Sequence, residues 1–144
     1  IDHVREILTY EESTKVPLMP MFLKGIFNLR GQVIPLLDLS MRFWGTSADI
    51  HERTGIAVLE IDHEGNDHTL GVMVECFDDV VIIPEEDIQH PASLGIGVRK
   101  EFLRGVIRKD DSMIMLLDTQ KVLSLDELAS LVSSMDEINN KEEV

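Results

Sequence analysis

Turn residues interrupt the apolar sequence every few positions, and this spacing constrains the fold more than any other feature of the chain. Apolar runs that suit short strands span 33–39, 56–61, 69–74, 80–83, 102–108 and 112–117. The clusters DHEGND (62–67) and KDD (109–111) separate two pairs of these runs and predict two hairpins, the first with a loop longer than two residues. With the N-terminal segments, about eight short strands at regular spacing indicate barrels or a sandwich.

The N-terminal third carries several backbone signals. Asp2 is a candidate cap for a helical turn across residues 1–8, and two prolines within 9–20 predict a loop. Residues 25–31 then suit a strand end followed by a turn. Pro35 lacks a backbone N–H, so the strand at 33–39 is expected to lie at a sheet edge or to carry a bulge there.

The C-terminal segment differs from the rest because its apolar residues recur at helical spacing. Ser124 and Glu127 form a capping box, which places a helix start at residue 124. We therefore expect a C-terminal helix over 124–138. The apolar side of this helix consists of Leu125, Leu128, Leu131, Val132, Met135 and Ile138.

Charge and composition restrict the class of partner. The chain has 144 residues, enough for one domain, and a formal net charge of -14, which disfavours nucleic acid and anionic membrane surfaces. No apolar run approaches the ~20 residues that a membrane span needs, so direct membrane insertion is not expected. Cys76 is the single cysteine, which excludes a disulfide framework and a multi-cysteine metal site within one chain. A protein partner with a basic or apolar face fits this composition.

The residues offer little for catalysis. His63, Glu64 and His68 lie in one short segment, so a metal-dependent enzyme that uses them is an alternative function. The same segment is rich in Asp, Asn and Gly, which are the residues expected at a solvated hairpin tip. No nucleophile elbow, phosphate-binding loop or dinucleotide fingerprint is present, and we predict neither a metal nor a cofactor.

Arg30 is the polar residue that most needs an explanation. It lies between Leu29 and Gly31, directly before the apolar strand at 33–39. It could belong to an ordinary surface turn, or its guanidinium could tie two elements together through a carboxylate, with Glu6 as the candidate partner. It could also anchor an interface, because arginine is enriched at binding hot spots. Both the structural and the interface interpretations stay open at this point.

An ordered set of motifs resembles the CheW-like adaptor domain of bacterial chemotaxis. The set comprises Val4, Glu6 and Ile7, then Pro17 and Pro20, Lys24-Gly25, Asn28-Leu29-Arg30-Gly31, Ile34-Pro35 and Asp38-Leu39. The later stretch FLRGVIRKDDSMIMLLDTQKVLS (102–124) is similar to the closing hairpin of that family. The resemblance covers nearly the whole chain.

The resemblance implies a mainly β fold of two small five-stranded barrels, SH3-like or OB-like, that share a core and precede the C-terminal α-helix. The barrels would comprise residues 1–46 with 98–123, and residues 54–91. The family normally has one or two strands before the V-x-E-I element, and the sequence starts at the edge of that element. We therefore expect either that these residues were removed or that a partner strand comes from another chain. An unpaired edge of this kind would favour a strand-exchanged homodimer.

The resemblance also implies a non-catalytic scaffold that bridges the regulatory domain of the histidine kinase CheA to the cytoplasmic hairpin tips of methyl-accepting chemoreceptors. Such a protein would be cytoplasmic and associated with membrane receptor arrays. The receptor-side positions are Val4, Glu6, Gly25, Asn28, Arg30 and Gly31, with Val80 as a weaker match, and the kinase-side positions are Gly55 and Ile56. The alternative within the same family is a module of a larger protein, as in CheV or the regulatory end of CheA.

Overall fold

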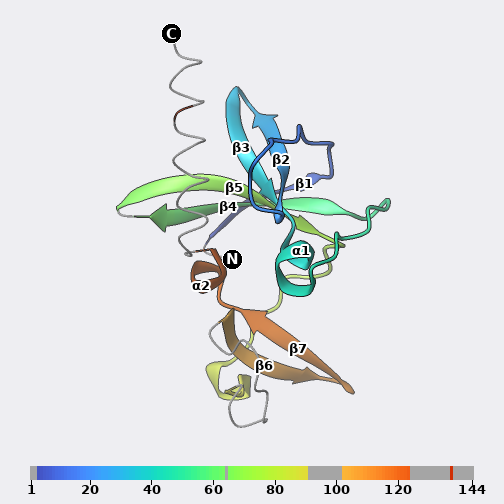
Figure 1. The fold of residues 1–144 in the computed structure, drawn as a ribbon. Coiled ribbons are helices and arrows are strands. Elements are labelled where there is room, and N and C mark those ends of the chain that lie inside the picture. Colours follow the sequence, from blue (N-terminus) through green and yellow to red (C-terminus); the bar gives the residue numbers. More distant parts are fainter. Residues whose placement is uncertain (1–2, 64, 91–101, 124–136, 138–144) are drawn as a thin grey trace. The chain divides into compact units, whose positions relative to one another are not determined.

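The computed structural model describes residues 3–63, 65–90, 102–123 and 137, and these are mainly β, as the spacing of turn residues predicts (Figure 1). The chain divides into two compact units, one of Ile1–Asp78 with Asp126–Val144 and one of Asp79–Leu125. Strands from 1–46 and from 54–91 pair within one sheet. The expected barrels, 1–46 with 98–123 and 54–91, stay a prediction. The two units are described separately.

The first unit contains a five-stranded sheet and one short helix. Its strands follow the order β1-β4-β5-β3-β2, with β3 and β5 parallel and the other neighbours antiparallel. Their bounds are β1 (Val4–Thr9), β2 (Leu23–Leu29), β3 (Gln32–Leu37), β4 (Gly55–His63) and β5 (Asn66–Val74). The strand β1 replaces the helical turn that Asp2 suggested, because residues from Val4 to Thr9 pair along β4.

The five-stranded sheet curls, so that its two end strands approach each other. In a flat sheet β1 and β2 would lie about 19 Å apart, since neighbouring strands are separated by about 4.8 Å. Instead, Thr14, which follows β1, pairs with Ile26 on the outer edge of β2 through two backbone hydrogen bonds of 2.8 Å. A contact between Glu6 on β1 and Arg30 after β2 closes the same gap. The curl is what brings the two halves of the candidate site together.

The core of this unit is formed by side chains of its strands, and those of β3 are the most deeply buried. Leu36 and Leu37 are fully buried, and Ile34, Ile56 and Val58 are almost so. Successive residues of β3 are buried on both faces, as expected for an interior strand with a parallel neighbour. Among the described residues, β3 pairs with β5 only at Leu36 and Leu37. Pro35 pairs with β2 but not with β5, so the backbone N–H that proline lacks is not needed for the ladder with β5.

A helix that the sequence pattern did not predict follows β3. The expected strand ends at Leu37 rather than Leu39, and α1 (Leu39–Trp44) begins directly afterwards. The buried carboxylate of Asp38 caps this helix by accepting hydrogen bonds from the backbone N–H groups of Ser40 and Met41, at 3.0 and 3.3 Å. Gly45 ends it in the left-handed region with φ 75°. At six residues, the helix is too short to show a clear helical period in its sequence.

The hairpin of β4 and β5 is longer than predicted. Its ladder continues to the pair His63↔Asn66, which leaves a two-residue connection where the sequence suggested a longer loop. Gly65 has φ 81°, a conformation that a glycine accepts without strain. The polar residues 62 and 66–68, which read as turn formers, therefore lie on strands that extend beyond the core.

The second unit contains a two-stranded antiparallel sheet of β6 (Leu103–Lys109) and β7 (Ser112–Leu117), the predicted second hairpin. It also holds a short 3-10 helix η1 (Glu85–Asp87) and the helix α2 (Thr119–Leu123). The predicted strand at 80–83 was wrong, because these residues join no ladder within the part of the chain that is described. The predicted helix 124–138 and the loop 91–97 lie outside the described residues, apart from residue 137.

Candidate interaction site

Arg30 lies at the tip of a tight hairpin, where two residues join β2 to β3. The pair Leu29↔Gln32 closes the ladder, and Arg30 and Gly31 have φ 50° and 87°. Positive φ at both central residues defines a type I′ turn, whose twist matches that of the flanking strands. The side-chain carbonyl of Asn28 accepts a hydrogen bond of 2.9 Å from the Gly31 N–H. Asn28 and Gly31 thus fix the turn, and Arg30 extends from it with 70% of its side chain exposed.

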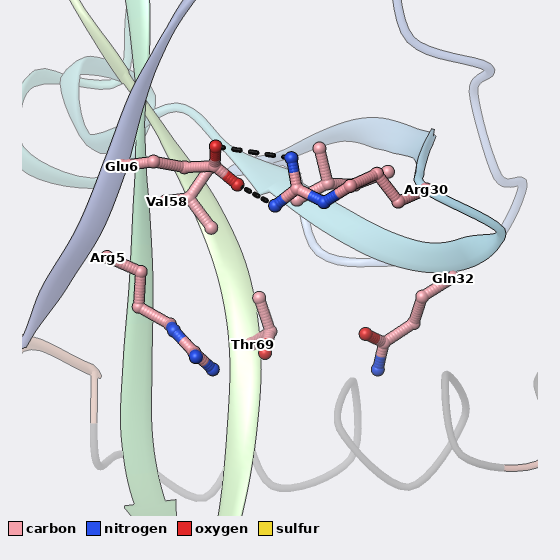
Figure 2. A pocket seen from close by; sticks show the side chains of 7 residues that line it. Arg5, Glu6, Arg30, Gln32, Val58 and Thr69 are labelled. Atoms are coloured by element: carbon pink, nitrogen blue, oxygen red, sulfur yellow. Dashed lines mark hydrogen bonds and ion pairs between the residues drawn. The ribbon is translucent and has the colours of Figure 1, made fainter.

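The structure brings Glu6 and Arg30 together as a bidentate ion pair (Figure 2). One guanidinium nitrogen, Nη1, lies 3.3 Å from Glu6 Oε2, and Nη2 donates to Oε1. The Arg30 hydrogen bond lowers the pKa of the Glu6 carboxyl below its usual value, and the same bond raises the pKa of Arg30. Both groups therefore stay charged across the physiological range.

A bulge in β1 gives the site a second arginine, which the sequence analysis missed. Val4 pairs with Leu59 and Glu6 with Val58, so Arg5 is an extra residue opposite the β4 ladder. Neighbouring residues of a regular strand point to opposite faces, whereas a bulge can turn both toward one face. Arg5 and Glu6 accordingly line the same pocket, and Arg5 forms an ion pair with Glu60 on β4.

The pocket between these groups is open, with a volume of about 360 Å³. Strand β1 contributes Arg5 and Glu6, and the β2–β3 turn contributes Leu29, Arg30 and Gln32. Val58 of β4 and Thr69 of β5 complete the lining. Polar side chains dominate the lining, so the pocket suits a polar or charged group rather than an apolar anchor.

The other receptor-side positions have different surroundings. Val4 lies on β1 and is partly exposed. Gly25 is buried where β2 meets Thr14, and an added Cβ would lie 2.6 Å from the Thr14 carbonyl oxygen. Gly25 therefore serves the closure of the sheet. Val80 belongs to the second unit, with 74% of its side chain exposed.

The two kinase-side positions offer no side chain to a partner. Ile56 is 1% exposed and lies in the core, and a Cβ at Gly55 would lie 2.4 Å from Phe77 Cε2. The side chain of Ile56 is enclosed in this chain, and the kinase-side role of both positions stays a prediction. The accessible groups beside them are Arg53 and Asp78, whose charged atoms are 3.6 Å apart.

The described residues contain neither a metal-binding cluster nor a helix that could span a membrane. There, no three His, Cys, Asp or Glu side chains are grouped closely enough to hold a metal ion. Glu64 and the side chain of His63, two of the three proposed ligands, lie outside the described residues. None of the described helices has the length and apolar composition that crossing a membrane requires.

Comparison with known proteins identifies the family. The CheW-like domain model matches residues 1–127. The chain is 30% identical to the chemotaxis protein CheW of Treponema pallidum, across 90% of this chain and 76% of that protein, and 30% identical to CheW of Klebsiella aerogenes, across 88% and 74%. The crystal structure of the scaffolding protein TtCheW from Thermoanaerobacter tengcongensis superposes with a TM-score of 0.73 at 28% identity, covering 88% of this chain and 79% of that one. The chain belongs to the CheW-like domain family.

Proposed function

We propose that this chemotaxis adaptor couples the cytoplasmic hairpin tip of a chemoreceptor to the regulatory domain of the histidine kinase CheA, and that it catalyses no reaction itself. It would do so within arrays of membrane receptors. The similar proteins are CheW proteins, and this chain aligns with most of their length. This favours an adaptor over a module of a larger CheV-type or CheA-type protein. A scaffold needs two separate faces, one for each partner.

The observation that carries the receptor face is the Glu6–Arg30 ion pair beside an open pocket. The pair joins the two ends of the curled sheet, and its arginine is presented on a type I′ turn. A preorganised guanidinium loses little freedom when a partner binds, which favours recognition. Val4, on the same strand as Glu6, adds a partly exposed apolar group, and Val80 is a further candidate contact.

The kinase face is proposed around the start of β4. Gly55 is packed between Phe77 and Leu8, so its role there is to keep this corner compact. The exposed side chains of Arg53 and Asp78 flank the corner and form the accessible surface. A charge reversal at Arg53 is a milder probe than a bulky residue at Gly55, which would displace Phe77.

The test is a three-component capture with proteins from the same genome. The receptor cytoplasmic hairpin is immobilised, and the CheA regulatory domain is added with or without the adaptor. We expect the kinase domain to be retained only when the adaptor is present. Arg30→Ala should reduce capture of the adaptor itself, whereas Arg53→Glu should leave the adaptor bound but lose the kinase domain.

A matched control is Arg104→Glu, which reverses an exposed, ion-paired arginine in the second unit. It should behave like the wild type. Retention of the kinase domain without the adaptor, or failure of the folded wild-type adaptor to bind either partner, would contradict the coupling function. Equal loss from Arg53→Glu and Arg104→Glu would remove the proposed kinase face.

A further inference from the structure

The pocket beside Glu6 has more hydrogen-bond donors than its own acceptors can use. A guanidinium carries five N–H donors and no acceptor, and Glu6 is approached by the two terminal nitrogens of Arg30. Arg5 brings a second guanidinium, with its Nη1 next to Glu60. In the view of Figure 2, the side chains of Arg5 and Gln32 lie on the two sides of Thr69, below the ion pair.

The lining is rich in arginine, although the chain as a whole is acidic. Two arginines and one glutamate line the pocket, whereas the whole protein carries a net charge of -14. Both arginines are mostly exposed, while their carboxylate partners are less so, at 29% for Glu6 and 30% for Glu60. The carboxylates thus hold the two guanidiniums in place, and each guanidinium has more N–H groups than its carboxylate partner engages.

The bulge at Arg5 is a second, independent sign that this face is built for recognition. A bulge sacrifices regular pairing, and bulges are common beside functional sites because they redirect a side chain. Here it turns Arg5 to the face of Glu6, where a regular strand would point it away. Without the bulge, the pocket would hold one arginine instead of two.

We propose that this pocket binds a carboxylate side chain of the protein partner between Arg5 and Arg30, with Gln32 and Thr69 as additional hydrogen-bonding groups. The inference deepens the proposed receptor face, and it names Arg5, Gln32 and Thr69 as specificity residues. A carboxylate fits because it accepts paired hydrogen bonds from a planar guanidinium. The volume of about 360 Å³ accommodates a whole Asp or Glu side chain.

The first experiment needs no partner protein. Capped glutamate (N-acetylglutamate N′-methylamide) is titrated into the labelled protein while the Nε–Hε signals of its arginines are followed by NMR. We expect saturable shifts for Arg5 and Arg30, and none from the isosteric capped glutamine. Arg104, an exposed arginine paired with Glu85, serves as the internal control. Equal responses to acid and amide, shifts of Arg104 in parallel, or shifts from inorganic phosphate but not from the capped glutamate would overturn the proposal.

The second experiment measures affinity for the receptor hairpin at several salt concentrations. Arg5→Gln should weaken binding by about 5- to 10-fold at low salt and flatten its salt dependence, because a charge-assisted contact is lost. Arg104→Gln removes a charge from a side chain of matched exposure, 60% against 59%, and should bind like the wild type. Gln32→Ala should show a smaller loss.

The two experiments separate the two proposals. If the hairpin does not bind the folded wild type, the receptor function fails, and the capped-glutamate titration alone decides whether the pocket takes a carboxylate. If the hairpin binds and Arg5→Gln matches the wild type across the salt series, the receptor function stands and the carboxylate pocket is refuted.

Discussion

Gly25 offers a sharp test of the reasoning about sheet closure. In Gly25→Ala, the new Cβ would lie 2.6 Å from the backbone carbonyl oxygen of Thr14 and 2.4 Å from Ser13 Oγ. A carbon atom and a non-bonded oxygen atom do not approach so closely, so the segment around Thr14 must move away from β2. That movement breaks two backbone hydrogen bonds of 2.8 Å between Thr14 and Ile26.

The expected cost follows from these contacts. Two lost hydrogen bonds contribute about 0.5–1.5 kcal/mol each, and overpacking a tight site costs about 1–3 kcal/mol, part of which is relieved by the movement. We therefore expect Gly25→Ala to lower the free energy of unfolding by about 2–4 kcal/mol. Urea unfolding followed by far-UV circular dichroism measures this directly.

Two controls identify the obstacle. Gly31→Ala meets open space and should cost about 1–2 kcal/mol from its positive φ alone. In Ser13→Gly/Gly25→Ala the side-chain clash is gone but the Thr14 carbonyl remains, so most of the loss should persist relative to Ser13→Gly. A Gly25→Ala protein within 0.5 kcal/mol of the wild type, by the size of ordinary surface effects, would refute the closure argument.

Three further predictions concern other parts of the chain. Asp38→Ala should lower the free energy of unfolding by about 2–3 kcal/mol in urea, because the backbone N–H groups at positions 40, 41 and 48 lose their acceptor. The stability difference between wild type and Glu6→Gln should be largest above pH 4.5 and should shrink as the pH falls through the lowered pKa of Glu6. The reason is that Arg30 stabilises only the charged carboxylate. Urea titrations at a series of pH values test this. Gly105→Ala places a Cβ 2.3 Å from Ile88 Cγ2 and should destabilise by about 1–3 kcal/mol, with partial recovery in Gly105→Ala/Ile88→Ala, as measured by thermal unfolding.

Local signals in the sequence predicted the parts of the fold that depend on neighbouring residues. The β4–β5 and β6–β7 hairpins were predicted because turn residues separate apolar runs of strand length. Gly31 likewise indicated the turn that presents Arg30. The helix α1 was missed although Asp38 and Gly45 are typical caps, because six residues are too few to show a helical period. Caps without a helical period are a weak signal when a strand precedes them.

Residues 80–83 show the opposite failure. Two valines and two isoleucines in a row have high β propensity, yet they form no strand ladder among the described residues. Propensity reports that a residue suits a pleated sheet, whereas a ladder also needs a partner edge in register. The sequence contains no local information about which edges the fold leaves available.

The candidate site contains two backbone irregularities, a turn that can be predicted from the sequence and a bulge that cannot. The type I′ turn is readable because few residues besides glycine accept φ 87°. The bulge at Arg5 is not, because the alternation of β1 would place Arg5 and Glu6 on opposite faces, and only the register of Val4 and Glu6 against Leu59 and Val58 shows the extra residue. Strand β4 is about fifty residues away, so the second arginine enters the pocket through a non-local pairing. A carboxylate pocket with two arginines therefore depends on how β1 pairs along β4, and removing the bulge should abolish it while leaving the Glu6–Arg30 pair intact.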